Sequence, residues 1–130
     1  MVTDTIGDII IRLKNGNEAN KEAVVVSHSN LKEAVANLLA KEGYVKSVSK
    51  KKKGVEKSIE IALAYAGGLP RIREVQRVSK PSRRVYMKST ELRPFKRGTG
   101  MVVVSTSKGL MSDKEAKAAK LGGEVLFKIW

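Results

Sequence analysis

The stretch at residues 101–115 constrains the fold most, because it joins a strand signal directly to a helix signal. Residues 101–104 read Met-Val-Val-Val, an apolar and β-branched run typical of a buried strand. Residues 112–115 read Ser-Asp-Lys-Glu, a capping box that predicts the start of a helix. Between them lie three hydroxyls, a cation and a turn-forming glycine: Ser105, Thr106, Ser107, Lys108 and Gly109. The pattern predicts a small polar platform at the end of a stiff strand, and a plain strand-to-helix loop is the competing interpretation.

The chain is strongly basic, and its charge is unevenly distributed. It has 26 Lys and Arg against 13 Asp and Glu in 130 residues, a net charge of +13. Residues 1–43 hold five basic and six acidic side chains, whereas residues 44–130 hold 21 and 7. This asymmetry indicates one basic face for a polyanion, most often nucleic acid, with an anionic membrane surface as the other candidate.

Several classes of protein are disfavoured by what the sequence lacks. Cysteine is absent, which excludes disulfides, thiol catalysis and cysteine metal sites. No run of 18 apolar residues occurs, and the N-terminus lacks a basic region followed by an apolar core, so neither a membrane span nor a signal peptide is predicted. We therefore expect a cytoplasmic protein without a metal or cofactor.

Residues 1–66 predict a small α-β-α-β-β domain with two helices on one face of a sheet. The first helix is indicated by Ile6, Ile9, Ile10 and Leu13 at helical spacing, with Thr3 or Thr5 as its cap and Asn15-Gly16 near its end. A strand at residues 23–28 precedes a second helix, for which Asn30 and Glu33 are the expected capping pair. Strands at residues 44–49 and 57–65 then form a hairpin whose solvated tip is Lys50 to Lys53 with Gly54. The single histidine, His28, is expected to be structural.

An Ala-Gly-Gly-Leu-Pro break at residues 66–70 marks the predicted boundary between domains at 1–66 and 67–130. Residues 71–97 then carry ten Lys and Arg against two Glu, a net charge of +8. Within this segment Arg83, Arg84, Tyr86 and Lys88 interleave cations with an aromatic ring, and such planes can stack on unpaired bases and bind phosphates. A charged edge strand that resists aggregation is the alternative. We favour RNA binding, because ten cations exceed what an edge strand needs.

The end of the chain predicts a short helix and a last strand. Gly122-Gly123 should end the helix at residues 112–121, and residues 124–130 should form the strand with Val125, Phe127 and Ile129 on one face. Glu124 is an acid beside the basic platform. It could hold Lys108 or a hydroxyl in position, accept a base amino group, or be a plain surface carboxylate.

The chain resembles the bacterial small-subunit ribosomal protein S-eight family over essentially its whole length. The N-terminal motifs that carry the resemblance are Asp4-Thr5-Ile6-Gly7-Asp8, Arg12-Leu13-Lys14-Asn15-Gly16 and Leu31-Lys32. The later motifs are Arg77-Val78-Ser79-Lys80-Pro81, Arg84-Val85-Tyr86 and the highly specific block at residues 100–130 with VVVSTSKGLM and LGGEVL. Thr5 departs from the family, in which proline is usual after the aspartate.

The resemblance implies an α+β protein of two small α/β domains, the second mostly strand with one short helix. It implies a non-enzymatic primary binder of small-subunit 16S rRNA at a stem of the central domain, next to ribosomal proteins S-five and S-twelve. Some members also repress translation of ribosomal-protein mRNA. The implied RNA-binding residues are Ser105, Thr106, Ser107, Lys108, Gly109, Glu124, Tyr86, Arg84, Lys80, Lys88, Thr3, Asp4, Arg12, Asn15 and Lys32. The expected location is the small ribosomal subunit in the cytoplasm, and the free protein is expected to be a monomer.

Three competing functions are weaker. A basic nuclease would need clustered carboxylates for metals or for a general base, and the seven acids of residues 44–130 are scattered. An RNA chaperone would bind unrelated RNAs with similar affinity. A membrane-surface protein would need a basic amphipathic helix with large apolar residues, which the sequence does not contain.

Overall fold

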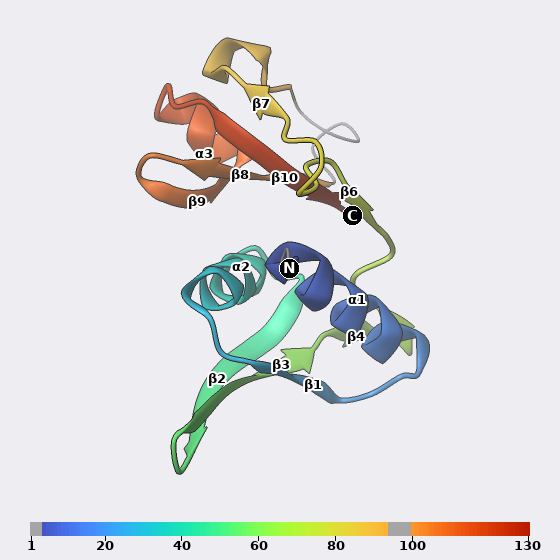
Figure 1. The fold of residues 1–130 in the computed structure, drawn as a ribbon. Helices are drawn as coiled ribbons and strands as arrows, with labels where there is room; N and C mark the ends of the chain where they lie inside the picture. Colours follow the sequence, from blue (N-terminus) through green and yellow to red (C-terminus); the bar gives the residue numbers. More distant parts are fainter. Residues whose placement is uncertain (1–3, 94–99) are drawn as a thin grey trace. The chain divides into compact units, whose positions relative to one another are not determined.

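Helices and strands alternate in the first part of the chain, and strands dominate the second part (Figure 1). A computed structural model describes residues 4–93 and 100–130. The elements of the first part are α1 (Thr5–Glu18), β1 (Ala23–Ser27), α2 (Asn30–Lys41), β2 (Val45–Lys53), β3 (Glu56–Leu63), β4 (Tyr65–Ala66) and β5 (Leu69–Pro70). Those of the second part are β6 (Val75–Arg77), β7 (Tyr86–Met87), the 3-10 helix η1 (Ser89–Glu91), β8 (Met101–Thr106), β9 (Gly109–Ser112), α3 (Asp113–Ala118) and β10 (Gly123–Ile129).

The chain divides into two compact units, each with a core of its own. One unit, called here the N-terminal unit, is Thr5–Arg73; the other, the C-terminal unit, joins Asp4 to Glu74–Trp130. The predicted α+β class is confirmed, with α-β-α-β-β first and a mostly β part with a short helix second. The predicted domain boundary at residue 66 stays a prediction, since compact units are not by themselves domains.

The N-terminal unit is a three-stranded antiparallel sheet, in the order β1-β3-β2, with α1 and α2 packed on it. The helical stripe of α1 is buried as its spacing predicts, and so are alternate residues of β3. The fully buried side chains include Ile9, Leu13, Val35, Leu39, Ile59 and Ile61. Near the end of α1, a Cβ on Gly16 would lie 2.5 Å from Cγ1 of Val24, so glycine there allows the helix to approach β1 closely.

Helix α1 ends at Glu18, so Asn15-Gly16 lies near its end as predicted. Two other local predictions in the N-terminal unit are wrong. Ser29, rather than Asn30, caps α2, because its Oγ accepts a hydrogen bond from the backbone N–H of Lys32 at 3.1 Å. Lys50 to Lys53 belong to strand β2, and the turn begins only at Gly54. Thr5 is the first residue of α1, and Thr3 lies outside the described residues.

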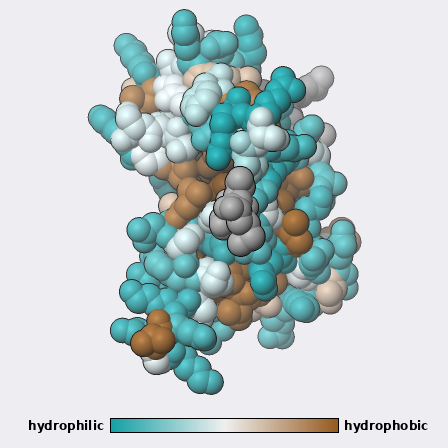
Figure 2. Space-filling model, viewed as in Figure 1, coloured by the Kyte–Doolittle hydropathy of each residue, from teal (hydrophilic) through white to brown (hydrophobic). Residues whose placement is uncertain are grey.

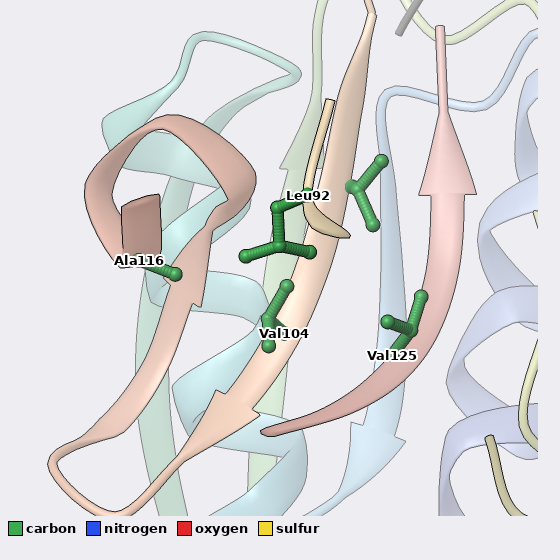
Figure 3. Close-up of a cluster of buried hydrophobic side chains, with 5 residues drawn as sticks. Leu92, Val104, Ala116 and Val125 are labelled. Atoms are coloured by element: carbon green, nitrogen blue, oxygen red, sulfur yellow. The ribbon is translucent and has the colours of Figure 1, made fainter. Parts of the chain in front are cut away.

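The C-terminal unit is an antiparallel sheet in the order β6-β10-β8-β9, with β7 also paired to β10. One face of it carries a cluster of Leu92, Val102, Val104, Ala116 and Val125. Figure 3 shows Leu92, Val104, Ala116 and Val125 gathering from four different parts of the chain. The predicted cap of α3 is confirmed, since Oγ of Ser112 accepts from the N–H of Glu115 at 3.2 Å.

The polar platform lies in a β-hairpin, which corrects the prediction of a loop leading straight into a helix. Strand β8 runs through Ser105 and Thr106, turns at Ser107 and Lys108, and returns as β9. Because β9 intervenes, the platform is separated from the start of α3 by a full strand. Gly109 has φ of 109°, the positive value that the sequence led us to expect at this turn.

A β-bulge at Leu126 overturns the prediction that Val125, Phe127 and Ile129 share one face of the last strand. Val125 pairs with Val104, whereas Phe127 pairs with Val103, so the register slips by one residue between them. Since Val103 and Val104 point to opposite faces of β8, Val125 and Phe127 also lie on opposite faces. All three residues are buried nevertheless.

Candidate nucleic-acid interface

The turn of the β8–β9 hairpin is closed by the side chain of Thr106. Its Oγ1 donates a hydrogen bond to the carbonyl of Gly109 at 2.8 Å and accepts one from the N–H of Lys108 at 3.2 Å. Ser107 and Lys108 are exposed, while Ser105 and Thr106 are half-buried. Thr106 therefore fixes the shape of the turn, and Ser107 and Lys108 are the side chains free to meet a ligand.

A cross-strand row connects this hairpin to the aromatic residue of the basic segment. Glu124 on β10 pairs with Ser105 on β8 and with Tyr86 on β7. Directly paired residues of neighbouring strands lie on the same face, so Ser105, Glu124 and Tyr86 form one row across three strands. Tyr86 as a residue is 68% exposed, which leaves its ring available for stacking on a base.

Glu124 is held by an arginine rather than by Lys108 or a hydroxyl. Nη1 of Arg84 lies 3.2 Å from Oε2 of Glu124, and the side chains are 51% and 18% exposed respectively. The mostly buried carboxylate thus orients an exposed guanidinium beside the row. The sequence suggested Lys108 or a hydroxyl as the group that Glu124 holds, whereas the structure gives Arg84 as its partner.

Two glycines allow β7 and β8 to flank the start of β10. A Cβ on Gly123 would lie 2.0 Å from the carbonyl oxygen of Ser105, and a Cβ on Gly122 would lie 2.5 Å from that of Met87. No real side chain fits at such distances. The Gly-Gly pair, which the sequence suggested only as a helix stop, is what lets the row of Ser105, Glu124 and Tyr86 assemble.

The basic residues before Tyr86 lie on a loop that is closed by backbone hydrogen bonds at its base. Lys80 and Arg83 exchange backbone hydrogen bonds at 2.9 and 3.0 Å, which closes a tight turn. Below this turn the buried Ser79 accepts from the N–H of Val85 at 2.9 Å and donates to the carbonyl of Val85 at 3.3 Å. Lys80, Arg83 and Arg84 are exposed as a result.

Sequence reasoning missed the role of Ser79, because a buried hydroxyl bound to its own loop has no signature beyond the turn residues after it. The remaining predicted cation of this unit, Lys88, is exposed. It lies just before the 3-10 helix, and its N–H donates to Oε1 of Glu91 at 2.9 Å.

The predicted N-terminal residues are dispersed. Asp4 binds the guanidinium of Arg77 through both carboxylate oxygens, within the C-terminal unit. Arg12 and Asn15 are exposed and line one cavity of about 410 Å³ together with Lys21. Lys32 is 7% exposed, and Thr3 lies outside the described residues.

Lys32 has an internal partner set. Its Nζ lies 2.7 Å from Oδ2 of Asp8 and donates to Oγ of Ser27 at 3.0 Å. Asp8 also receives Nε of Arg12 at 3.5 Å. The hydrogen bond from Lys32, followed by the charges of Lys32 and Arg12, holds the pKa of Asp8 below its ordinary value of 3.8 despite partial desolvation.

The described residues offer neither a metal site nor a bilayer-spanning helix. Among residues 4–93 and 100–130, no three His, Cys, Asp or Glu side chains come together as metal ligands would. Within those same ranges, no helix combines the length and apolar character needed to cross a bilayer.

Comparison with known proteins connects these features to one family. Residues 4–130 match the family model described as ribosomal protein S8. The chain is 44% identical over 129 residues to "Small ribosomal subunit protein uS8" of Novosphingobium aromaticivorans, covering 99% of this chain and 98% of that protein. It is 45% identical over 130 residues to the protein of that name from Mycoplasmopsis synoviae, with the same coverage. The chain therefore belongs to the ribosomal protein S8 (uS8) family, the non-enzymatic small-subunit proteins of the cytoplasmic ribosome.

Proposed function

We propose that this chain is a primary binder of 16S rRNA that recognises and stabilises a stem of its central domain during assembly of the small subunit. The observation that carries the proposal is the row of Ser105, Glu124 and Tyr86, continuous with the exposed turn at Ser107 and Lys108. Short hydroxyls, a stacking ring and a rim of cations stand on one rigid sheet. That is the set of groups that an irregular RNA stem calls for.

The chemistry of RNA explains this division of labour. The base edges of A-form RNA are hidden in a deep, narrow groove, so proteins read 2′-hydroxyls, the shallow groove and unpaired bases. Ser105 and Ser107 can approach sugars and base edges closely and can donate or accept. Tyr86 can stack on a displaced base, and Gly109 keeps the turn slim enough for close approach.

The cations supply affinity without sequence preference. Lys80, Arg84, Lys88 and Lys108 are all exposed in the C-terminal unit. Their contacts to phosphates would release counterions and make binding depend strongly on salt. Glu124 orients Arg84 for this purpose, as their ion pair suggests.

In the N-terminal unit, Arg12 and Asn15 are the better candidates for RNA contact, since both are exposed around one cavity. Asp4 and Lys32 act indirectly in this proposal. Asp4 is bound to Arg77, and the ammonium of Lys32 is bound by Asp8 and Ser27. The finer partners of the proposal, ribosomal proteins S-five and S-twelve and a ribosomal-protein mRNA stem, rest on the family resemblance alone.

Substitution of Ser107 tests whether the hairpin turn specifies the RNA. We expect Ser107→Ala to weaken binding to the central-domain stem by roughly 1–3 kcal/mol, since a group on the RNA would lose its partner. Binding to an unrelated stem of equal length should change little. Equilibrium titration of both RNAs at one salt concentration measures the difference.

Ser49→Ala is the matched control, because Ser49 is also an exposed serine but lies on β2 of the N-terminal unit. It should leave both affinities unchanged. Equal losses on the two RNAs with Ser107→Ala would remove the specifying role. Similar wild-type affinity for both RNAs would instead favour a chaperone that binds RNA without site preference.

A further inference from the structure

The β2–β3 hairpin extends as an arm whose lysines face a second cavity. In Figure 1 the two strands run on past the helices to a narrow tip. A cavity of about 270 Å³ near that end is lined by His28, Lys50, Lys51, Lys52, Lys57 and Ser58. We call His28, Lys50, Lys52 and Lys57 the lysine cradle. None of its residues belongs to the surface proposed above for the rRNA stem.

The strand register places the cradle on the same face as α2. Lys50 pairs with Ile59, which is buried in the core of the unit, and Lys52 pairs with Lys57. Lys50 and Lys52 are two residues apart and so lie on one face. The N–H of His28 donates to the carbonyl of Lys57 at 3.0 Å, which extends the row to β1.

One acidic side chain of α2, Glu33, contacts the lysine cradle. Glu33 accepts from Nε2 of His28 at 2.8 Å and lies 3.4 Å from Nζ of Lys50. The hydrogen bond from His28, with smaller contributions from Lys50, lowers the pKa of Glu33 below its ordinary 4.5, so the carboxylate is ionised at neutral pH. Among the described residues, this carboxylate contacts His28 and Lys50 and makes no ion pair with Lys52 or Lys57.

Lys52 and Lys57 are the unusual pair. They lie directly opposite each other on neighbouring strands, and neither has an acidic partner among the described residues. Like charges in directly opposed positions destabilise a sheet. By contrast, Lys51 on the other face is neutralised by Glu60 at 2.6 Å. An anion between Lys52 and Lys57 would remove the repulsion that the free protein carries.

We propose that the lysine cradle binds phosphates of the RNA backbone, as a contact separate from the β8–β9 hairpin. This proposal rests on the proposed function, in which RNA is the ligand of the protein. It adds a second contact to the RNA that does not depend on nucleotide sequence. The space suits a phosphate with water around it, since one water takes up roughly 30 Å³ of liquid. A protein partner fits less well, because lysine is depleted at protein–protein interfaces.

The surface of the arm supports the same reading. Figure 2 shows the end of the arm as hydrophilic apart from one small hydrophobic patch. Val55 in the turn is 95% exposed, and the neighbouring residues from Lys50 to Lys53 and Lys57 are all exposed lysines. A single valine offers little apolar area for a protein interface, whereas five lysines suit a polyanion.

The test compares two doubly substituted full-length proteins of equal charge. K52Q/K57Q removes the opposed pair, and K46Q/K53Q removes two other exposed lysines of β2. Binding to a transcript of the whole 16S central domain is measured between 50 and 200 mM salt. We expect K52Q/K57Q to bind about tenfold more weakly at the low-salt end and to lower the magnitude of the salt slope by about 2.

The control should lower the slope by less than about 1. Equal salt slopes of RNA binding for the two variants would overturn the proposed phosphate contact at the lysine cradle. That conclusion would hold whether or not Ser107→Ala retains its specific effect. Loss of the Ser107→Ala effect with the cradle effect intact would instead overturn the proposed role of the hairpin. The two proposals therefore fail separately.

A second readout identifies the source of the phosphate. Amide chemical shifts of His28 and Ser58, which line the cavity in both proteins, are followed by NMR in wild type and K52Q/K57Q, with inorganic phosphate or the RNA transcript added. Shifts with RNA that the substitutions abolish support the backbone contact. Shifts with inorganic phosphate alone, and none with RNA, would overturn it in favour of a free-anion site. Thermal unfolding of the free variants shows whether they fold, and we expect K52Q/K57Q to be at least as stable as wild type.

Discussion

At the scale of single residues, several polar side chains make hydrogen bonds or ion pairs within the protein itself. Thr106 closes its own turn, Ser79 pinches its own loop, and Lys32 is shared between Asp8 and Ser27. Each of these atoms is occupied in the free protein. The side chains that we propose to contact RNA, such as Ser107, Arg84 and Arg12, lie next to these residues and are therefore held on fixed supports.

The Asp8–Lys32 pair gives a stability prediction. We expect Asp8→Ala to lower the free energy of unfolding by roughly 1–3 kcal/mol at pH 7, because a buried ammonium loses its charged acceptor. Urea unfolding monitored by circular dichroism measures the change. Glu18→Ala is the control, since Glu18 is an exposed acid at the end of the same helix, and it should have little effect.

The pH dependence of that difference has a definite sign. The pKa of Asp8 is lowered in the folded protein from its ordinary value of 3.8, so the folded state binds fewer protons than the unfolded state. The stabilisation is complete above the unfolded value and is lost as pH falls through the lower, folded value. The stabilities of wild type and Asp8→Asn should thus begin to approach each other as pH falls below about 3.8 and should meet only below the lower, folded pKa. A gap that persists unchanged in acid would show that the charge of Asp8 is not its source.

At the scale of elements, the start of β10 is the organising point of the C-terminal unit. It pairs with β8 on one side and with β7 on the other, and Gly122 and Gly123 make room for both. The β8–β9 hairpin, Tyr86 and Glu124 are therefore positioned by one short piece of strand. Damage there should affect all three at once.

Gly123→Ala tests that dependence. Its methyl would overlap the backbone of Ser105, so β8 must move, and we expect a loss of roughly 1–3 kcal/mol in unfolding free energy with weakened binding to the cognate stem. Gly68→Ala is the comparison, because Gly68 has φ of 81° but open space around it. It should cost stability without changing RNA affinity. Unchanged binding by a folded Gly123→Ala protein would show that the junction does not position the site.

At the scale of the whole molecule, the chain holds two cores that are separate in sequence. The N-terminal unit buries Leu39 and Ile61 among others, and the C-terminal unit buries Val104 and Val125. Cores of this kind commonly open as separate cooperative units. We propose that the two units are also the two folding domains of the chain.

Native-state hydrogen exchange tests this proposal. Leu39→Ala removes a fully buried side chain and should cost roughly 2–5 kcal/mol in its own unit. Amides of β3 should then exchange faster, while amides of β8 and β10 keep their protection. Val104→Ala should give the reverse pattern. Equal loss of protection in both units from either substitution would show a single cooperative domain.

Prediction from sequence succeeded where the signal was local and periodic. The stripe of Ile6, Ile9, Ile10 and Leu13, the alternation in β3 and the capping box at Ser112 each depend on neighbours within one turn or one strand. The α+β class followed from their order. The family followed from motifs spread along the whole chain, which full-length relatives confirm.

The failures share one cause, which is dependence on a distant partner. The bulge at Leu126 is decided by pairing with β8, some 20 residues earlier, and by the N–H groups of Val78 and Ser79, which both donate to its carbonyl. The partner of Glu124 is Arg84, 40 residues away. Lys50 to Lys53 continue β2 because β3 pairs with them, although their composition favours a loop. No period or spacing within one segment carries such information.

The bulge at Leu126 has a last consequence for how such a chain can change. Glu124 before the bulge and Phe127 after it pair with Ser105 and Val103, which lie on one face of β8, whereas Val125 pairs with Val104 on the other face. A strand that kept Leu126 in regular alternation would move Phe127 and Ile129 to the face of Val125, away from the face of Glu124 and of the row that we assign to RNA. The extra residue therefore decides which side of the sheet the end of β10 packs against, and we expect one further inserted residue there to be tolerated far less than one in the turn between β2 and β3.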